Sequence, residues 1–427
     1  MLILKNIVKE YAVGDTKITA LDHINLSFKG NEFVSVAGFP GSGKTTLLNI
    51  IGGLDRYTSG ELSINGKSTK TFSDMDWDVY RSQSIGVVHQ GDVLLPQLTV
   101  LANMEIALTL AGAPRSGRVE RAAAVLRMTG LGDQMDKTPD QMSPGQRQCA
   151  GIARALVNNP DIILADEPAG ALDRQSGTRI MEILKEISMD KLIIITAGNP
   201  ELPMKYASRI ITLSGGTVVS DSQPYHVAVE KPSQHKKGKN SRKLIKRARK
   251  NSSMSILTAL SFSMKSMLTK KAGAFAALLA GSIAVTGIAL SVMPGISHML
   301  TAAKAAVITA ISLIVSCTFI GAVTYNSILD RTREIGILRK FGASRRDICR
   351  IISGEACITG FLAGAAGICV TLAVSNPVNM AFRAFTGIAG PVKLTPVISL
   401  ALLFLSVAIN FAAAYLASLA AVKKDPK

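Results

Sequence analysis

The sequence predicts a chain of two dissimilar parts: an α/β domain over residues 1–225, then an all-α membrane domain over residues 272–427. Three observations support this prediction. A compact apolar segment, a glycine-rich turn and a helical pattern follow one another between residues 33 and 52. Four long apolar stretches without charge occur, all of them after residue 271. A strongly basic segment separates the two regions.

Size and composition agree with two parts in different surroundings. A chain of 427 residues suggests two or three domains. Hydrophobic residues make up 48% of it, and the mean hydropathy is +0.29, which argues against a purely soluble protein. The cysteines show neither metal-binding spacing nor a disulfide pattern; they are Cys149, Cys317, Cys349, Cys357 and Cys369. We therefore predict no metal centre built from cysteine.

The first part alternates strands and helices. Short strands are expected over residues 2–7 and 18–28, and a compact strand over 33–37 leads into a helix over 44–52. Residues 91–150 are expected to be mostly helical, and two more buried strands over 162–164 and 192–196 follow. Such alternation predicts a mostly parallel sheet. The start of the chain lacks the pattern of a signal peptide, so we expect a cytosolic N-terminus.

Residues 38–46 read G-F-P-G-S-G-K-T-T and fit the pattern G-x-x-x-x-G-K-[ST]. Glycines let backbone N–H groups surround phosphates, the lysine reaches the outer phosphates, and the next hydroxyl binds Mg²⁺. The helix that follows directs its positive N-terminus at the anion. The pattern therefore predicts a nucleotide-phosphate site formed by Gly38, Gly41, Ser42, Gly43, Lys44, Thr45 and Thr46.

Asp166 and Glu167 end an apolar strand, and we expect them to complete this site. Asp166 is predicted to hold Mg²⁺, together with Thr45. Glu167 is predicted to polarise the water that attacks the terminal phosphate.

The order of these motifs resembles the nucleotide-binding domain of ABC transporters. Residues 142–146 occupy the place of the family signature, and residues 170–173 resemble its D-loop. The resemblance implies ATP and Mg²⁺ as cofactors, with adenine stacked on Tyr11. It implies that Gln90 binds the metal and, with Glu167 and Lys44, is catalytic. It also implies nucleotide contacts from Ser143, Gly145, Gln146 and Asp173.

The sequence departs from the family where the nucleotide should be enclosed. Pro144 replaces a signature glycine and removes one backbone N–H. Ala197 and Gly198 stand where the family has a histidine that contacts the γ-phosphate. Met142 and Cys149 are lesser departures. Because such donors stabilise the transition state, we expect ATP binding to be retained and hydrolysis to be slow.

Four transmembrane helices are predicted, over residues 272–293, 305–329, 356–375 and 397–422. Lys and Arg gather before the first, between the second and third, and after the fourth. The positive-inside rule therefore places both termini in the cytosol of a multi-pass protein in the cell membrane. Glu355 lies at the cytosolic edge of the third span, and an interfacial and a functional role both remain open.

Residues 226–253 form a basic linker, with ten Lys or Arg and no acid between Lys231 and Lys250. Two interpretations remain open: attraction to anionic lipid, or a solvated linker that obeys the positive-inside rule. No recognition motif accompanies the charge, so nucleic acid is not an expected partner.

Residues 330–344 resemble the cytosolic segment of MacB/FtsX-type permeases, which in that family docks on the nucleotide-binding domain. A solvated charged loop is the alternative. Residues 254–271 resemble the amphipathic interfacial helix before the first span, with an ordinary helix end as the alternative. Only residues 294–304 separate the first two spans, so the large extracytoplasmic domain of MacB-type proteins is not expected.

These features predict an ATP-binding/permease subunit, working as a homodimer or as a heterodimer with a related ABC subunit in the lipid bilayer. The expected transported substrate is an amphipathic or lipid-like molecule such as an antimicrobial peptide. The alternative is an ATP-switched regulatory or signalling membrane protein that transports little.

Overall fold

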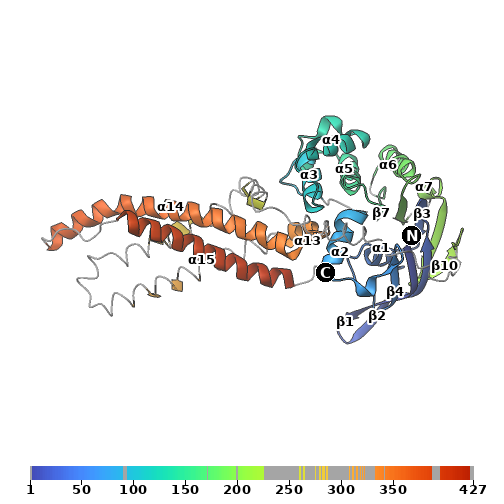
Figure 1. The fold of residues 1–427 in the computed structure, drawn as a ribbon, viewed down its shortest axis with the longest axis horizontal. Helices are drawn as coiled ribbons and strands as arrows, with labels where there is room; N and C mark the ends of the chain where they lie inside the picture. Colours follow the sequence, from blue (N-terminus) through green and yellow to red (C-terminus); the bar gives the residue numbers. More distant parts are fainter. Residues whose placement is uncertain are drawn as a thin grey trace, which may run out of the picture. The chain divides into compact units, whose positions relative to one another are not determined.

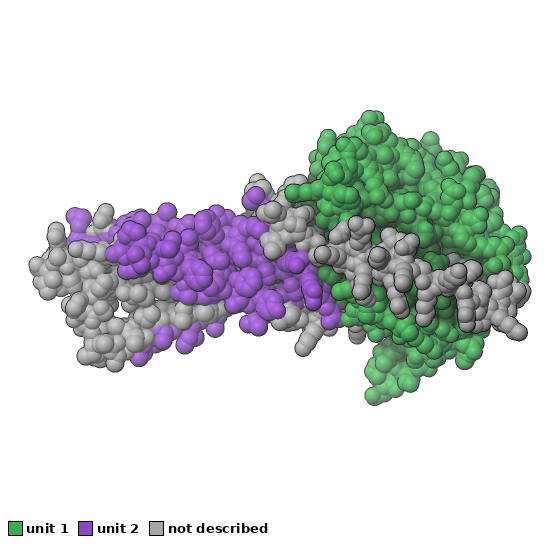
Figure 2. Space-filling view, in the orientation of Figure 1, with its two compact units in different colours: residues 1–253, 337–344 green, residues 254–336, 345–427 purple. Residues whose placement is uncertain are grey.

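The computed structural model describes residues 2–89, 94–170, 172–198, 201–225, 332–340, 342–386 and 395–423, with isolated positions between 259 and 322. The chain divides into two compact units (Figure 2). One comprises Met1–Ser253 and Ile337–Ser344, and the other comprises Met254–Gly336 and Arg345–Lys427. A short segment from the second half of the sequence therefore belongs to the N-terminal unit.

The N-terminal unit contains a six-stranded sheet in the order β10-β9-β3-β8-β7-β6. Its strands are β3 (Glu32–Ala37), β6 (Ile85–Val88), β7 (Ile162–Ala165), β8 (Leu192–Ala197), β9 (Arg209–Ser214) and β10 (Thr217–Asp221). All pairs are parallel except β9–β10. Every residue of β3, β7 and β8 is buried, as expected for parallel strands covered on both faces.

A second, antiparallel sheet has the order β2-β1-β4-β5. It consists of β1 (Leu2–Val13), β2 (Thr16–Phe28), β4 (Ser59–Ile64) and β5 (Lys67–Ser68). The expectation of a single mostly parallel sheet was incomplete here. The first two strands are also longer than predicted, because their ends pair with each other as a hairpin while β4 covers the other edge of β1.

Helices pack around these sheets in two groups, each with its own core. The helices of this unit are α1 (Lys44–Ile51), α2 (Asp74–Val79), α3 (Val100–Leu110), α4 (Arg118–Met128), α5 (Pro144–Leu156), α6 (Arg174–Ile187) and α7 (Glu201–Met204). Single turns occur as η1 (Thr69–Thr71), η3 (Gly132–Gln134) and η4 (Pro139–Gln141), and η2 (Tyr80–Ser84) is a π-helix. In Figure 1, α3, α4 and α5 gather into one helical group.

The second unit contains the helices α14 (Arg345–Thr386) and α15 (Pro396–Lys423), and α13 (Thr332–Lys340) precedes them. The segments Arg345–Ser375 and Pro396–Leu416 are long and apolar enough to cross a membrane. The predicted spans over 356–375 and 397–422 lie within α14 and α15. The predicted spans over 272–293 and 305–329 fall mostly outside the described residues, as do the basic linker and most of the predicted interfacial helix.

Small residues allow α14 and α15 to approach closely. A Cβ added to Gly360 would lie 3.0 Å from the Cα of Val407. The hydroxyl of Ser406 donates a 2.8 Å hydrogen bond to the carbonyl oxygen of Gly360. Such contacts are typical of helices that associate in lipid. Asn410, one turn along α15, is also buried and donates to the carbonyl oxygen of Ser406.

Candidate nucleotide-binding site

The glycine-rich turn lies between β3 and α1, where two of its glycines are required by close backbone contacts. A Cβ added to Gly38 would lie 2.4 Å from the carbonyl oxygen of Leu213. Gly43 has φ +98°, and an added Cβ would lie 2.5 Å from the carbonyl oxygen of Ala20. Any side chain at these positions would therefore displace backbone, which explains why the loop is built from glycine.

The loop presents donors suited to phosphate. The ammonium of Lys44 donates to the carbonyl oxygens of Gly38 (2.8 Å) and Phe39 (3.0 Å), so the lysine lies over its own loop. The hydroxyl of Ser42 is buried and has no hydrogen-bond partner within the described part of the chain. The first turn of α1 carries no acidic residue, and no side chain caps it. An anion at this helix N-terminus would satisfy these donors.

The carboxylate of Asp166 joins the loop to two neighbouring strands. Thr45 donates a 3.0 Å hydrogen bond to its Oδ2 atom, and Thr196 donates a 2.5 Å hydrogen bond to its Oδ1 atom. The contact arises because the carboxyl ends of β3, β7 and β8 meet at one edge of the sheet. A hydroxyl beside a carboxylate offers the oxygen ligands that Mg²⁺ prefers, so these residues fit the metal.

Glu167 is held in an uncommon backbone conformation, with φ +46°. Its N–H donates a 2.9 Å hydrogen bond to the hydroxyl of Thr196, which links it to the same cluster. A Cβ added to Gly198 would lie 3.1 Å from Oε1 of Glu167. The space beside this carboxylate is therefore lined by a residue that has no side chain. Non-glycine residues in this conformation are frequent at functional sites.

The predicted signature residues cap α5. Ser143 accepts a 3.2 Å hydrogen bond from the backbone N–H of Gln146, whose side chain accepts a 3.0 Å bond from the N–H of Ser143. Pro144 occupies the first helical position, where the missing N–H costs the helix nothing. The proline therefore fits the helix, and its effect is limited to the donor that it removes.

The predicted D-loop residue lies close to this cap. Asp173 caps α6 and accepts a 2.9 Å hydrogen bond from the N–H of Ser176, which together with the Ser176 hydroxyl lowers the pKa of its carboxyl. A Cβ added to Gly145 would lie 2.9 Å from the hydroxyl of Ser176. The starts of α5 and α6 are therefore in contact, and Gly145 makes that contact possible.

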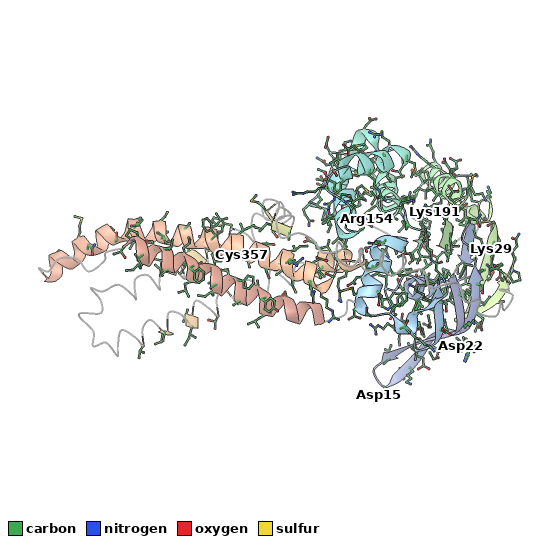
Figure 3. All side chains as sticks on the ribbon, in the orientation of Figure 1. Asp15, Asp22, Lys29, Arg154, Lys191 and Cys357 are labelled. Atoms are coloured by element: carbon green, nitrogen blue, oxygen red, sulfur yellow. The ribbon has the colours of Figure 1, made fainter. Side chains whose placement is uncertain are left out.

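Gln90 lies outside the described residues, but its neighbour His89 is described. Burial, followed by the positive charges of Lys340 and Arg154, lowers the pKa of His89 to about 3. Its Nε2 atom is buried without a hydrogen-bond partner among the described residues. Arg154 lies on α5 (Figure 3). The imidazole is therefore neutral at physiological pH.

Lys340 belongs to the segment Ile337–Ser344, which is part of the N-terminal unit. Gly342 has φ +82°, and an added Cβ would lie 2.6 Å from the carbonyl oxygen of Asp78 and 2.8 Å from the backbone N of Ser82. Gly342 therefore contacts the end of α2 and the π-helix η2 directly. π-Helical turns of this kind are frequent at functional sites.

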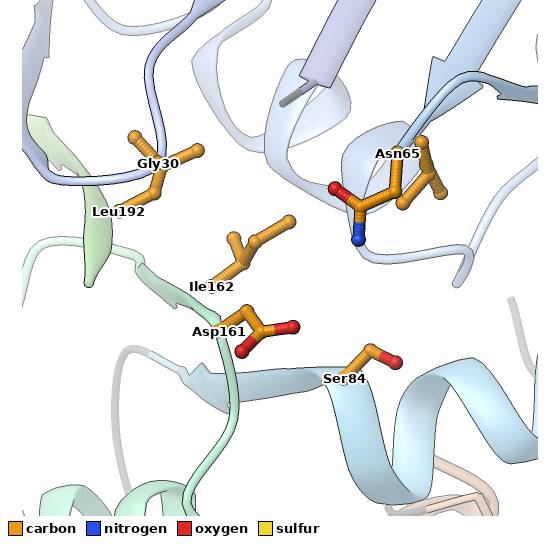
Figure 4. A pocket seen from close by; sticks show the side chains of 7 residues that line it. Gly30, Asn65, Ser84, Asp161, Ile162 and Leu192 are labelled. Atoms are coloured by element: carbon orange, nitrogen blue, oxygen red, sulfur yellow. The ribbon is translucent and has the colours of Figure 1, made fainter. Parts of the chain in front are cut away.

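A small pocket lies at the opposite edge of the sheet (Figure 4). Asp161, Ile162 and Leu192 line it at the amino ends of β7 and β8, with Gly30, Asn65 and Ser84. Its volume of about 40 Å³ has room for a few water molecules at most. It is therefore not a site for a nucleotide.

Two features of the site were missed by the sequence reasoning. Thr196 ends an apolar strand, and a polar residue at the carboxyl end of a buried parallel strand was a usable signal. Asp55 accepts a 2.7 Å hydrogen bond from the hydroxyl of Tyr11. Nothing in the sequence indicated that contact, because the two residues are 44 positions apart.

Comparison with known proteins relates the two parts of the chain to two family models. The ABC transporter family model matches residues 21–170, and the model of the FtsX-like permease C-terminal region matches residues 306–426. An uncharacterized ABC transporter ATP-binding protein of Methanocaldococcus jannaschii is 42% identical over 219 residues, 51% of this chain and 98% of that protein. The chain belongs to the ABC transporter family and carries an ABC-type ATPase domain.

Its combination of an ATP-binding part and an FtsX-like permease part is that of a fused MacB/FtsX-like protein. The macrolide export ATP-binding/permease protein MacB of Bartonella quintana is 41% identical over 222 residues, which cover 52% of this chain and 34% of MacB. The match thus spans about a third of the length of such relatives. The dimeric structure of a bacterial ABC transporter cassette, MJ0796, matches with 39% identity and a TM-score of 0.50, over 53% of this chain and all of the cassette.

Proposed function

We propose that this chain is the ATP-binding/permease subunit of a MacB/FtsX-like ABC transporter. It would couple ATP binding and slow hydrolysis to the export or extraction of an amphipathic or lipid-like substrate, such as an antimicrobial peptide. The observation that carries the proposal is the cluster of Thr45, Asp166 and Thr196 beside a glycine-rich phosphate loop.

In this proposal the phosphates are held by Lys44, Ser42 and the backbone of the loop, and Tyr11 contacts adenine. Mg²⁺ would neutralise phosphate charge, with Thr45, Asp166 and Gln90 around it. Glu167 accepts a proton from the attacking water. Ser143, Gly145, Gln146 and Asp173 serve the nucleotide of a partner subunit, which would be a second copy or a related ABC subunit. The dimeric cassette MJ0796 supports such pairing.

Hydrolysis is proposed to be slow because two donors are missing. Ala197 and its neighbour Gly198, which lies next to the carboxylate of Glu167, supply no donor side chain to polarise the terminal phosphate. Pro144 supplies no backbone N–H at the start of α5. Either loss weakens stabilisation of the charge that develops in the transition state.

We also propose that the chain crosses the cell membrane four times as a multi-pass protein, with both termini in the cytosol. The proposal also keeps the boundaries 1–225, 226–253, 254–271 and 272–427 for the cassette, basic linker, interfacial helix and permease. The contact of Gly342 with α2 and η2 supports the idea that residues 330–344 transmit motion of the cassette to the permease.

ATP turnover and vesicle efflux test this function. The full-length chain would be reconstituted in lipid nanodiscs and in vesicles loaded with a fluorescent cationic amphipathic peptide. We expect micromolar ATP binding, slow turnover that Glu167→Gln abolishes, and peptide movement that depends on ATP. Turnover at ordinary transporter rates would contradict the slow-site proposal, and absence of ATP binding would contradict the function as a whole.

The alternative, an ATP-switched regulatory membrane protein, is favoured by two departures from the family: Ala197 and Gly198 stand in place of a histidine, and Pro144 alters the signature. A cassette that closes on ATP and reopens slowly would remain in its ATP-bound, closed conformation for long enough to act as a signal. ATP-dependent closure without movement of peptide or lipid in the same vesicles would support this second function.

A further inference from the structure

Tyr11, Lys9 and Asp55 form a hydrogen-bonded cluster between β1 and the turn after α1. The hydroxyl of Tyr11 donates to Oδ2 of Asp55, and the ammonium of Lys9 donates to Oδ1, both at 2.7 Å. The backbone N–H of Arg56 also donates to Oδ1 at 2.7 Å. Both oxygens of the carboxylate are therefore engaged, and the tyrosine hydroxyl is held at a fixed point.

The ring of Tyr11 is contacted by a cation on one face. The ammonium of Lys9 lies 4.6 Å from the ring centroid, within the range of cation–π attraction. The lysine is itself fixed, because it also donates a 2.7 Å hydrogen bond to the carbonyl oxygen of Arg56. The Lys9 side chain is 11% exposed, whereas Tyr11 is 37% exposed. One ring face is therefore covered by Lys9, while Tyr11 retains accessible surface.

The charge states of the cluster are stable near neutral pH. Burial and the hydrogen bond to Asp55 raise the pKa of Tyr11, so its hydroxyl remains a donor. Burial acts to raise the pKa of Asp55, but hydrogen bonds from Lys9, Tyr11 and Arg56 outweigh it and lower that pKa. The carboxylate therefore stays ionised and keeps both donors.

The cluster also connects the ring to the helix that follows the phosphate loop, through Asp55 and Asn49. Thr46 lies in the first turn of α1, directly after Thr45, and its side chain acts to lower the pKa of Tyr11 against the two larger effects that raise it. Asp55 follows the end of the same helix, where its backbone N–H donates to the carbonyl oxygen of Asn49 at 3.2 Å. Asp55 thus ties the ring to the turn that follows α1.

We propose that Lys9 and Asp55 are positioning residues that hold Tyr11 as a rigid platform for the nucleobase. They determine how much more tightly the site binds ATP than inorganic triphosphate, which lacks the nucleoside. The inference rests on the proposed ATP site and adds to it the residues that act through Tyr11. A pre-organised ring loses little freedom on binding, which is why the anchors matter for affinity.

The test compares two ligands that differ by the presence of a nucleoside. Dissociation constants for Mg²⁺–ATP and for Mg²⁺ with inorganic triphosphate are measured on the full-length chain in nanodiscs. Tyr11→Phe keeps the ring but removes its hydroxyl anchor, and Asp55→Asn weakens both anchors. Lys9→Met removes the cation, while Lys17→Met, an exposed lysine on the same hairpin, is the matched control.

We expect Lys9→Met to weaken ATP by about two- to five-fold, the scale of one exposed cation–π contact. Asp55→Asn is expected to weaken ATP by about ten-fold, the scale of one charged hydrogen bond. Triphosphate binding stays unchanged in all variants, and Lys17→Met changes neither ligand. Tyr11→Phe combined with Asp55→Asn adds little beyond Asp55→Asn alone.

An equal loss for ATP and triphosphate would overturn the inference, since it would show a general structural role. Unchanged ATP affinity in both Tyr11→Phe and Asp55→Asn would overturn it as well. If the wild-type chain binds triphosphate but not ATP, the proposal that Tyr11 contacts the base is wrong, while the proposal that the loop binds phosphate is supported. If it binds neither, the proposed function fails first.

Discussion

The hydroxyl of Thr196 donates a 2.5 Å hydrogen bond to Oδ1 of Asp166 and accepts the backbone N–H of Glu167 at 2.9 Å. One buried side chain thus orients both acidic residues of the proposed site. Thr196→Val keeps the shape of the side chain but removes both bonds. We expect ATP turnover to fall by about ten-fold or more, because the buried N–H loses its acceptor and the carboxylate its donor.

The control is Thr196→Ser, which retains the hydroxyl and should retain most of the activity. The Mg²⁺ dependence of turnover in nanodiscs provides the second readout, since a displaced Asp166 should raise the Mg²⁺ requirement in the valine variant alone. Equal turnover and equal Mg²⁺ requirement in both variants would contradict this role for Thr196.

A histidine at position 198 should accelerate hydrolysis. Gly198 is exposed, and the nearest described group to an added Cβ is the flexible end of Glu167, whose Oε1 at 3.1 Å would have to move slightly. Gly198→His would place an imidazole beside that carboxylate. We expect turnover to rise on the order of 10-fold or more, the scale of one pre-organised donor.

Two comparisons make that result specific. Gly198→Phe has a similar ring without a donor and should not raise turnover. Ala197→His should lower the melting temperature, because Ala197 is 4% exposed within β8. An increase with phenylalanine, or none with histidine, would show that the missing donor does not limit the rate.

Gly342→Ala should loosen the segment Ile337–Ser344. The added Cβ would approach the backbone of Asp78 and Ser82 to less than 3.0 Å, in a left-handed conformation that alanine disfavours. Gly336→Ala, in α13 with nothing within 4 Å of the added Cβ, is the matched control. We expect faster hydrogen exchange over residues 78–84 and 337–344 in the first variant only, with ATP affinity unchanged. Equal exchange in the two variants would argue against this contact.

His89 should make the folded protein less stable in mild acid. The pKa of His89 in the folded protein is about 3, below its ordinary value of 6.5. Between these values the unfolded chain binds a proton that the folded chain does not, so stability falls as pH decreases from 6.5. One such proton corresponds to about 1.4 kcal/mol per pH unit.

Thermal unfolding of the full-length chain from pH 7.5 to 5 measures this effect. His89→Gln should have a flatter profile than the wild type. His23→Asn, a replacement at an exposed histidine, is the comparison variant. A wild-type slope retained by His89→Gln would assign the acid sensitivity to other groups.

Much of the cassette was predictable because its signals are local. Consecutive residues give an apolar strand, the loop from Gly38 to Thr46 and then a helix. The structure has β3 and α1 at these positions. The same holds for α15, whose bounds Pro396–Lys423 nearly coincide with the uncharged run. The antiparallel sheet was not predictable in this way, because β1 finds its partner β4 more than fifty positions along the chain.

The sequence by itself determined the family to which the chain belongs, and it predicted the phosphate loop and the acidic pair Asp166 and Glu167. It could do so because backbone conformation and charge at neighbouring positions are encoded locally. Only the tertiary structure decided that Thr196 joins the two acids, that Asp55 anchors Tyr11, and that Gly342 contacts the end of α2. Those contacts join distant residues, and they depend on which strand edges and helix ends the packed sheets bring together.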